Sequence, residues 1–359
     1  MVGKILCKIA RLDENKNNYI GCICGQGGKF GLAFCDVSTG AFYVTVCADA
    51  PAAASELGRF YPAEVFRFGA AACADVLNEA LRHRLHCCLT EGTEAQFQLT
   101  EAGSTLESHF GKSLAELGLE NLPEGIMAAG SLLRHLIALQ KNNLSHIIDL
   151  QYYTTGRFME LDLDARRNLE LEETLRLKDK KGTLLWVLDK TRTPMGGRLI
   201  RSWLEKPLLD PVEIDRRHSA VENFVNDPIR RSELTEVLRD VTDLERITTR
   251  IVTGSVNARE LLGLARGLRT LPVIKQLLSD AKSPLLSKLE AAIDPLSDCA
   301  DLIEQTIVDE PPLTVREGGI IRPGANADAD KLRDIMQGGT STIAAIEASE
   351  KDKTGIRTL

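Results

Sequence analysis

The residue best placed to do chemistry is Asp36, which follows an apolar run and precedes a Ser-Thr-Gly turn. A carboxylate at the end of a strand can help to hold two magnesium ions that activate water for phosphodiester cleavage, with Glu64 or Asp75 as partners here. The same side chain can instead cap its own turn by accepting local hydrogen bonds. Because no convincing third carboxylate follows, the pattern favours the cap, and a metal-dependent nuclease remains the alternative.

Two glycine–lysine pairs resemble part of a phosphate-binding loop. In the Gly-Lys-Ser sequence at 111–113, Leu106 occupies the position of the first glycine that the loop requires. In the Gly-Gly-Lys sequence at 27–29, Phe30 replaces the Ser or Thr that would bind magnesium. The sequence therefore predicts no cofactor site and no catalytic residue in this chain.

The nine cysteines are concentrated near the N-terminus, where eight of them fall between Cys7 and Cys88. Cys22 and Cys24 alternate along an expected strand and share one of its faces. A structural zinc site needs two ligand pairs with suitable spacing, but the second pair here is the adjacent Cys87-Cys88. We therefore predict buried, reduced thiols and no metal site.

Arginines and an apolar stripe in the middle of the chain allow two readings each. The arginines suggest a DNA track, but acidic residues lie within helical reach of them, so we predict paired and solvated helix faces. Met195, Leu199 and Trp203 recur at four-residue spacing, which predicts core positions rather than the wall of a ligand site. The arginines are Arg166, Arg167, Arg198, Arg201, Arg246 and Arg250, and the acids are Glu170, Glu172, Glu205, Asp243 and Glu245.

Length and composition limit the classes of protein. A chain of 359 residues suits two or three domains, and 43% hydrophobic residues supply their cores. The net charge of −7 argues against a free-standing basic nucleic-acid binder, although a local basic patch remains compatible with it. No apolar run reaches about 18 residues and no signal peptide opens the chain, so we expect a cytoplasmic protein without a membrane partner.

The first segment, residues 1–150, is predicted to be an α/β domain with a mixed sheet and helices on its faces. Three hairpin-linked strands come first, and helices then alternate with strands. The expected strands are 20–24, 30–37, 41–47, 64–67 and 86–89, and the expected helices are 52–60, 72–84 and 126–140. The boundary is placed near residue 150.

The second segment, residues 151–359, is predicted to be almost entirely helical. A capping residue followed by proline marks five helix starts, at 193–194, 210–211, 227–228, 283–284 and 294–295. Asp210 with Glu213, and Thr242 with Glu245, have the spacing of capping boxes. We also expect a small hairpin at 313–321 and a last helix over 327–353 with an apolar stripe, formed by Leu332, Ile335, Met336, Ile343 and Ile346.

The order of motifs in 161–210 resembles one family closely. LDLDARRNLEL, GTLLWVLD and TPMGGRLIRSWLEKPL follow one another as at the start of the core, or lever, region of the bacterial MutS DNA mismatch repair proteins. The residues that carry this resemblance are Arg166, Arg167, Asn168, Leu169, Thr193, Pro194, Met195, Gly196, Trp203 and Pro207. The run FGLAFCDVSTGAF is similar to the family's connector domain, whose fold is RNase H-like. Residues 241–246, 311–324 and 353–359 match in order as well.

The resemblance implies a connector-plus-core piece of a larger protein. In this family a mismatch-reading domain with a Phe-x-Glu motif precedes such a piece, and a clamp and an ATPase domain with ATP and magnesium follow it. The intact protein would bind mismatched duplex DNA as a homodimer and recruit a MutL-type partner, with the connector as one candidate surface. This chain would couple ATP state to DNA grip without catalysis. An RNase H-like nuclease with a helical appendage, and a non-catalytic interaction scaffold, remain the alternatives.

Overall fold

The computed structural model describes residues 13–69, 74–139 and 144–355. It divides into two compact units, of which the first comprises Met1–Ser255 with Ile274–Ala292 and the second Val256–Val273 with Ile293–Leu359. The first unit holds the sheet and the helices that follow it directly. The predicted domain boundary near residue 150 falls inside this unit and stays a prediction.

The N-terminal segment forms a six-stranded mixed sheet with the order β5-β4-β1-β2-β3-β6. β1 (Tyr19–Gln26), β2 (Lys29–Asp36) and β3 (Ala41–Cys47) are antiparallel neighbours. β4 (Glu64–Gly69) runs parallel to β1, and β5 (Cys88–Glu91) runs parallel to β4. The short β6 (Gln151–Tyr152) pairs parallel with β3. The predicted mixed sheet is confirmed.

The turn between β1 and β2 follows from two glycines. Gln26 pairs with Lys29, which leaves Gly27 and Gly28 as a two-residue connection. Both have positive φ, +60° and +85°, as the hairpin turn that suits the twist of the strands requires. The pairing register places Cys22 and Cys24 on one face of the sheet, where both are buried in the same cluster.

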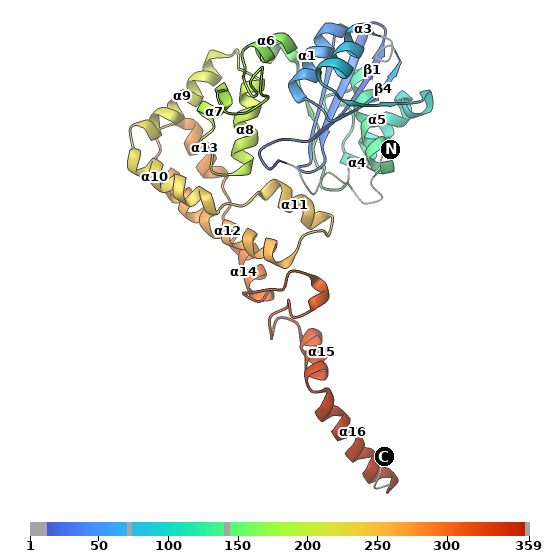
Figure 1. Cartoon of the computed structure of the whole chain (residues 1–359), viewed down its shortest axis with the longest axis vertical. Coiled ribbons are helices and arrows are strands. Elements are labelled where there is room, and N and C mark those ends of the chain that lie inside the picture. The colour runs from blue at the N-terminus through green and yellow to red at the C-terminus, as the bar shows by residue number, and fades with distance from the viewer. Residues whose placement is uncertain (1–12, 70–73, 140–143, 356–359) are drawn as a thin grey trace. The chain divides into compact units, whose positions relative to one another are not determined.

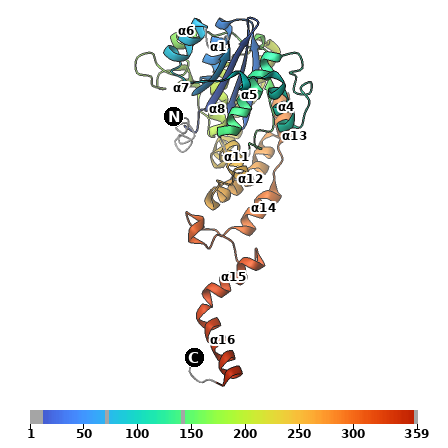
Figure 2. The ribbon, with the colours of Figure 1, turned by 90° about the vertical axis from the view of Figure 1, so that its right-hand side faces the viewer.

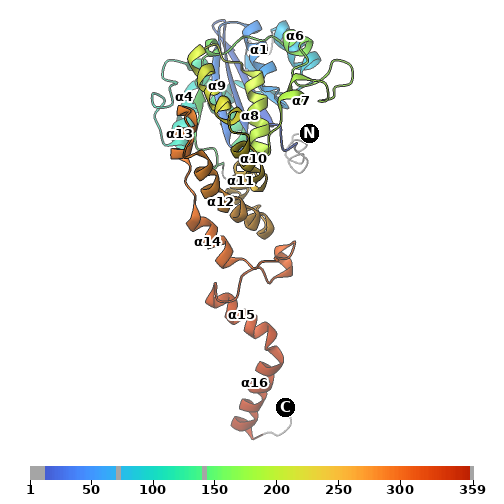
Figure 3. The same cartoon turned by 90° about the vertical axis from the view of Figure 1, so that its left-hand side faces the viewer.

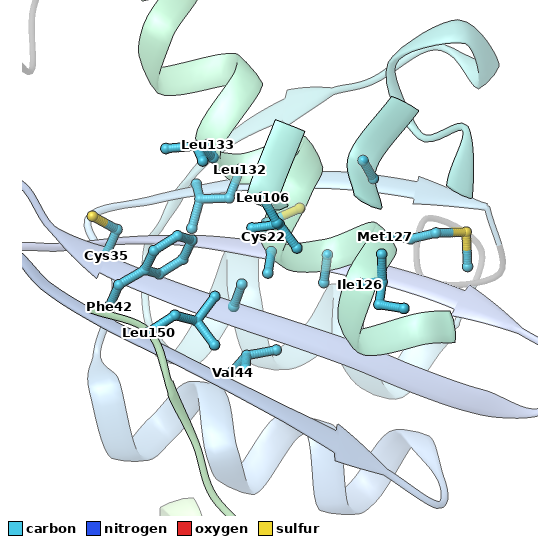
Figure 4. Close-up of a cluster of buried hydrophobic side chains, with 14 of the residues drawn as sticks. Cys22, Cys35, Phe42, Val44, Leu106, Ile126, Met127, Leu132, Leu133 and Leu150 are labelled. Atoms are coloured by element: carbon cyan, nitrogen blue, oxygen red, sulfur yellow. The ribbon is translucent and has the colours of Figure 1, made fainter. Parts of the chain in front are cut away.

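Helices cover both faces of this sheet (Figures 1 and 2). α5 (Pro123–Leu139) and α4 (Leu99–Phe110) lie on one face, where Phe42, Leu106 and Leu133 belong to one buried cluster (Figure 4). α1 (Ala50–Phe60), α3 (Asp75–Glu79) and its π-helical continuation (Ala80–Arg84) lie on the other face. The first residues of the helix predicted at 72–84 and the last of the one at 126–140 lie outside the described residues.

Helix α4 was not predicted, because its buried face is formed mostly by small residues. Ala102, Gly103 and Leu106 are its buried positions. A Cβ on Gly130 of α5 would lie 2.4 Å from the carbonyl oxygen of Ala102. The backbones of α4 and α5 therefore lie so close together that only glycine fits at position 130. Such a contact leaves little hydrophobic periodicity in the sequence.

The segment after the sheet is helical, as predicted. The first unit contains α6 (Leu163–Asn168), α7 (Leu184–Leu188), α8 (Pro194–Glu205), α9 (Pro211–Val225), α10 (Pro228–Val237), α11 (Leu244–Val252) and α13 (Pro284–Ala292). α9 and α13 are neighbours (Figure 3). α12 (Ala258–Leu278) contributes to both units, and α14 (Ser297–Thr306), α15 (Ala327–Gln337) and α16 (Gly339–Thr354) belong to the second.

The predicted helix starts are correct at four of the five prolines. Thr193, Asp210 and Asp227 each accept a backbone hydrogen bond in the first turn of α8, α9 and α10, and α13 begins at Pro284. The prediction at 294–295 was wrong, since α14 begins two residues later, after Leu296 in a left-handed conformation with φ +48°.

Neither predicted capping box forms. α11 is capped by Asp243, whose carboxylate accepts from the backbone N–H of Arg246, and not by Thr242. Glu213 in α9 pairs with Arg216 instead of reaching back to the backbone N–H of Asp210. In α9 the acidic side chain thus has another partner, and in α11 a neighbouring residue is the cap.

The C-terminal predictions need two corrections. The segment predicted as a hairpin contains a 3₁₀ turn at Val315–Glu317, and its one described pairing is the bridge between Ile307 and Ile321. Gly318 has φ +73° and directs the chain away from an extended strand. The single helix predicted over 327–353 is broken at Gly338 into α15 and α16. The side chains of its predicted stripe, Leu332, Ile335, Met336, Ile343 and Ile346, are exposed.

A candidate joint between the sheet and the helices

Asp36 is a buried structural residue whose acceptor sites are occupied. One carboxylate oxygen accepts from the backbone N–H of Ser38 at 2.9 Å and from its hydroxyl at 2.7 Å. The other accepts from Asn17 Nδ2 at 2.9 Å and from the backbone N–H of Asn18 at 3.0 Å. The predicted turn cap is confirmed, and the carboxylate additionally fixes the segment before β1.

The nuclease alternative gains no support from the neighbours of Asp36. Glu64 accepts a hydrogen bond from Thr90 at 2.7 Å and lies 3.7 Å from the His135 ring nitrogen. The structure groups no three His, Cys, Asp or Glu side chains at metal-binding distance within the ranges that it describes. Asp36 therefore serves the turn and its neighbouring segment.

The cysteines that the structure describes are free thiols, and most of those near the sheet are buried. Burial raises the pKa of Cys24 and of Cys47 to about 12, so both remain protonated and unreactive. Cys88 and Cys299 are exposed, which corrects the prediction of uniformly buried thiols. Cys7 and Cys73 lie outside the described residues.

The segment tethered by Asp36 is also bound by the helices. Arg198 of α8 donates to the carbonyl oxygen of Glu14 at 2.8 Å. Arg246 of α11 donates to the carbonyl oxygen of Lys16 at 2.7 Å and to that of Asp13 at 3.2 Å. Residues 13–18, here called the tether, are thus held by the sheet on one side and by two helices on the other.

Arg198 is the centre of this contact. Its side chain is only 4% exposed, and its guanidinium binds both carboxylate oxygens of Asp243, at 2.7 and 2.8 Å, and Glu245 at 2.6 Å. Burial by itself would lower the pKa of Arg198, but the hydrogen bonds that its guanidinium donates to the two carboxylates outweigh this effect and raise that pKa. The predicted pairing of this arginine is confirmed, whereas the predicted solvated face is wrong.

A glycine makes room for the tether beside Arg198. A Cβ on Gly197 would lie 2.6 Å from the side-chain oxygen of Asn15. A larger residue at this position would therefore force the side chain of Asn15 to move.

A second contact brings the end of α8 to the sheet. The ammonium group of Lys206 lies over the rings of Phe60, Tyr43 and Tyr153, at 4.1, 4.7 and 5.6 Å from their centroids. An ammonium group is attracted to the electron-rich faces of aromatic rings. Burial lowers the pKa of Lys206 and raises that of the neighbouring Glu205, so the pair lies in a largely dehydrated part of the joint.

α6 completes the joint on the other side of α1. Leu163 packs where a Cβ on Gly58 would come within 2.2 Å of its side chain. Arg84 pairs with Asp164 at 2.9 Å, and Arg166 donates to the carbonyl oxygens of Leu161 and Glu205 at 3.0 and 2.6 Å. These contacts connect helix α1 and its neighbours to the first helices of the second segment.

The residues that carry the family resemblance are distributed unevenly over this joint. Thr193 caps α8 through the backbone N–H of Gly196 at 3.0 Å, Pro194 is the first helical residue, and the carbonyl of Pro207 accepts from Met159 at 2.8 Å. Arg167, Asn168 and Leu169 are exposed. That these residues form a structural motif of the family stays a prediction.

The predicted core stripe on α8 was wrong. Trp203 is 39% exposed and is covered by the guanidinium of Arg217 at 3.8 Å from its ring, and Leu199 is exposed as well. Met195 is half-buried. The buried side of α8 is instead formed by Gly197 and Arg198, so close backbone packing and an ion pair replace an apolar stripe.

The tether and Lys206 were missed as functional positions. Their only sequence signals are a run of polar residues, DENKNN, before the first strand and a charged pair inside WLEKPL. Such residues usually indicate solvated loops. Their partners lie far away along the chain, which sequence spacing does not reveal.

Comparisons with known proteins agree with the two segments. The family model of MutS domain II matches residues 18–148, and that of MutS domain III matches residues 164–354. A protein named DNA mismatch repair protein MutS from Ruminiclostridium cellulolyticum is 40% identical over 98% of this chain and 40% of its own length. Proteins of that name from Lachnoclostridium phytofermentans and Symbiobacterium thermophilum are 39% and 40% identical over 97% of the chain, covering 37% and 40% of their own lengths.

The chain spans about two fifths of the length of these relatives, as the covered shares of 37–40% state. No helix in the described part of the chain is both long and apolar enough to cross a membrane.

Proposed function

The chain belongs to the MutS family, and we propose that it acts in DNA mismatch repair as a mechanical link between the connector and the helical core. Identity near 40% extends over almost the whole chain and includes both family domains. Because the chain spans about 40% of its relatives' length, the substrates and partners of a whole MutS protein enter here as part of the proposal.

The observation that carries the proposal is the tether. Asp36 holds one end of it to the sheet, and Arg198 and Arg246 hold its other end to α8 and α11. Buried charged hydrogen bonds are costly to separate unless both partners find new ones. A displacement of α8 or α11 is therefore passed to the sheet, which is what a link between two functional regions requires.

The chain itself performs no chemistry in this proposal. ATP and magnesium would be bound by an ATPase domain that neither family match includes, and this chain would hold no cofactor. Mismatched duplex DNA, a MutL-type partner and a second copy of the whole protein are the proposed partners, and the cytoplasm is the proposed location.

A chimera tests the role directly. The part of the Ruminiclostridium cellulolyticum MutS that matches this chain is replaced by it, and the chimera is expressed in a bacterium that lacks its own MutS. We expect the mutation rate to fall. In purified chimera, ATP should change the dissociation rate of mismatched DNA. Arg246→Met removes the hydrogen bonds to the carbonyl oxygens of Asp13 and Lys16 but keeps the buried pair of Arg198 with Asp243, so it should make this rate independent of ATP while ATP hydrolysis continues.

The control is Arg269→Gln, which removes an exposed arginine that also pairs with two carboxylates, Asp301 and Glu304. It should leave repair and coupling unchanged. A chimera that repairs normally with Arg246→Met would remove the tether from the proposal. A purified chain that cleaves DNA in magnesium would restore the nuclease alternative.

A further inference from the structure

The joint encloses a crevice that the contacts described above do not fill. Its volume is about 500 Å³, and the N-terminal segment forms one of its walls with Tyr19, Phe60 and Tyr61. The other wall comes from α6, the loop after it and α8, and includes Arg166 and Lys178. Small-molecule sites commonly enclose about 300–1,000 Å³, so this crevice has the size of a ligand site.

Most acidic groups on the crevice wall are already neutralised. Each of three carboxylates forms an ion pair with a cation that also lines the crevice. The pairs are Asp164 with Arg84, Glu173 with Lys16 and Glu172 with Arg201. Arg198, a fourth lining cation, is bound by Asp243 and Glu245 from outside the crevice.

Three lining cations remain without a carboxylate among the residues that the structure describes. The hydrogen bonds of the Arg166 side chain go to the backbone carbonyls of Leu161 and Glu205, which carry no charge. Arg167 and Lys178 form no ion pair in the described ranges. Glu205 is the one lining carboxylate left to oppose them.

The opposite wall is aromatic. Phe60 and Tyr19 meet edge to face with ring centroids 5.0 Å apart. Tyr61 projects beside them from the C-cap of α1 and is 60% exposed, although its backbone is left-handed with φ +47°. Residues with large side chains rarely adopt this backbone conformation. At Tyr61 the conformation places an exposed ring in the same crevice as the three cations.

We propose that this crevice binds a small organic phosphate, whose doubly charged phosphate meets Arg166, Arg167 and Lys178 while a flat ring lies against the exposed ring of Tyr61. Arginine binds phosphate through parallel N–H donors, and aromatic rings favour a stacked planar group. A dianion matches the excess of three cations over one carboxylate. The bound molecule would bridge the two walls of the joint, whatever the role of the chain in repair.

The first test uses adenosine 5′-monophosphate as the probe and the whole 359-residue chain. Calorimetric titration should give saturable binding with a dissociation constant below about 1 mM. Adenosine and inorganic phosphate, which carry one half of the ligand each, should bind at least about tenfold more weakly. Hydrogen exchange with the ligand bound should slow at Tyr61 and at residues 163–167.

Two matched double variants locate the phosphate. Arg167→Gln with Lys178→Gln removes two lining cations and should weaken binding about tenfold or more, since charged hydrogen bonds to the phosphate are lost. Lys190→Gln with Arg192→Gln removes the same charge from the nearby segment after α7, outside the crevice, and should leave the affinity within about twofold. Both pairs of side chains are exposed, so the fold should tolerate either change.

Tyr61→Asn tests the ring. Asn adopts the left-handed conformation more readily than Tyr, so this variant should fold and should lose affinity for the nucleotide while its weak affinity for inorganic phosphate stays the same. The absence of saturable binding would overturn the proposal, as would an equal loss in both double variants. Equal affinity for the nucleotide and for inorganic phosphate would also overturn it, because the ring would then contribute nothing.

Discussion

Asp36 and Arg198 bind the same short tether from opposite sides. Asp36 accepts hydrogen bonds from Asn17 and Asn18, and Arg198 donates to the carbonyl oxygen of Glu14 three residues earlier. The carboxylate belongs to the end of β2 and the guanidinium to α8, so an otherwise irregular segment connects the sheet to the helices. Both side chains are buried, which makes each sensitive to substitution.

Replacing Arg198 by methionine should destabilise the chain strongly. The substitution leaves the partly buried Asp243 without its main partner, and breaking a buried ion pair in this way costs about 3–5 kcal/mol. Chemical denaturation followed by circular dichroism measures the loss. Arg269→Gln is the control, since the carboxylates around that exposed arginine remain solvated, and it should leave the denaturation midpoint unchanged. Equal effects of the two variants would contradict the assigned importance of burial.

Asp36→Asn should destabilise the fold without removing any activity. An amide has a single acceptor oxygen, so donors on one side of residue 36 lose their partner, at a cost of about 1–3 kcal/mol for each buried group left unsatisfied. Thermal unfolding reports this loss. Incubation of the unsubstituted chain with DNA and RNA in magnesium or manganese should show no cleavage. Cleavage that disappears in the variant would reassign Asp36 to catalysis.

Acid should weaken the joint through Asp243. Burial opposes the charge of this carboxylate, but hydrogen bonds from Arg198 hold its pKa below the ordinary value. The unfolded chain then binds more protons than the folded chain as the pH falls below about 4, so stability that is present at neutral pH is lost there. Denaturant titrations at several pH values measure the free energy of unfolding, which should fall less steeply with decreasing pH in Asp243→Asn than in the unsubstituted chain. Glu233→Gln changes an exposed position without a described ion pair, so this variant should show the same dependence of stability on pH as the unsubstituted chain.

Limited proteolysis should cut first in α15 and α16. The apolar side chains of these helices are exposed, and Gly338 interrupts them, so neither is stabilised by a buried face. Trypsin should therefore cleave after Lys331, Arg333, Lys351 or Lys353 before it cleaves the segment around the sheet, as mass spectrometry of early fragments would show. A tail that survives while the sheet segment is digested would mean that these helices are covered in solution.

Several features were predictable because their causes are local. The glycines at 27 and 28 dictate a hairpin turn, since few other residues accept positive φ at both positions. Thr193 with Pro194 starts α8 because the cap and the fixed φ of proline act within one turn. Strand alternation likewise placed Cys22 and Cys24 in one cluster, and the order of motifs identified the family.

Other features were decided by the tertiary structure. Thr242 was the predicted cap of α11, but the structure has Asp243 as the cap, and Arg198 of α8 donates to the same carboxylate. The same contact buries Arg198, although the sequence had predicted a solvated helix face for this arginine.

The physical reason is that burial and charge pairing depend on groups far apart in the sequence. Arg198 lies 184 positions from Glu14, and Lys206 finds its aromatic partners on β3, α1 and the residue after β6. The sequence by itself therefore determined the local turns, most helix starts and the family. The buried charges of the joint, and the crevice beside them, arose only when distant segments packed together.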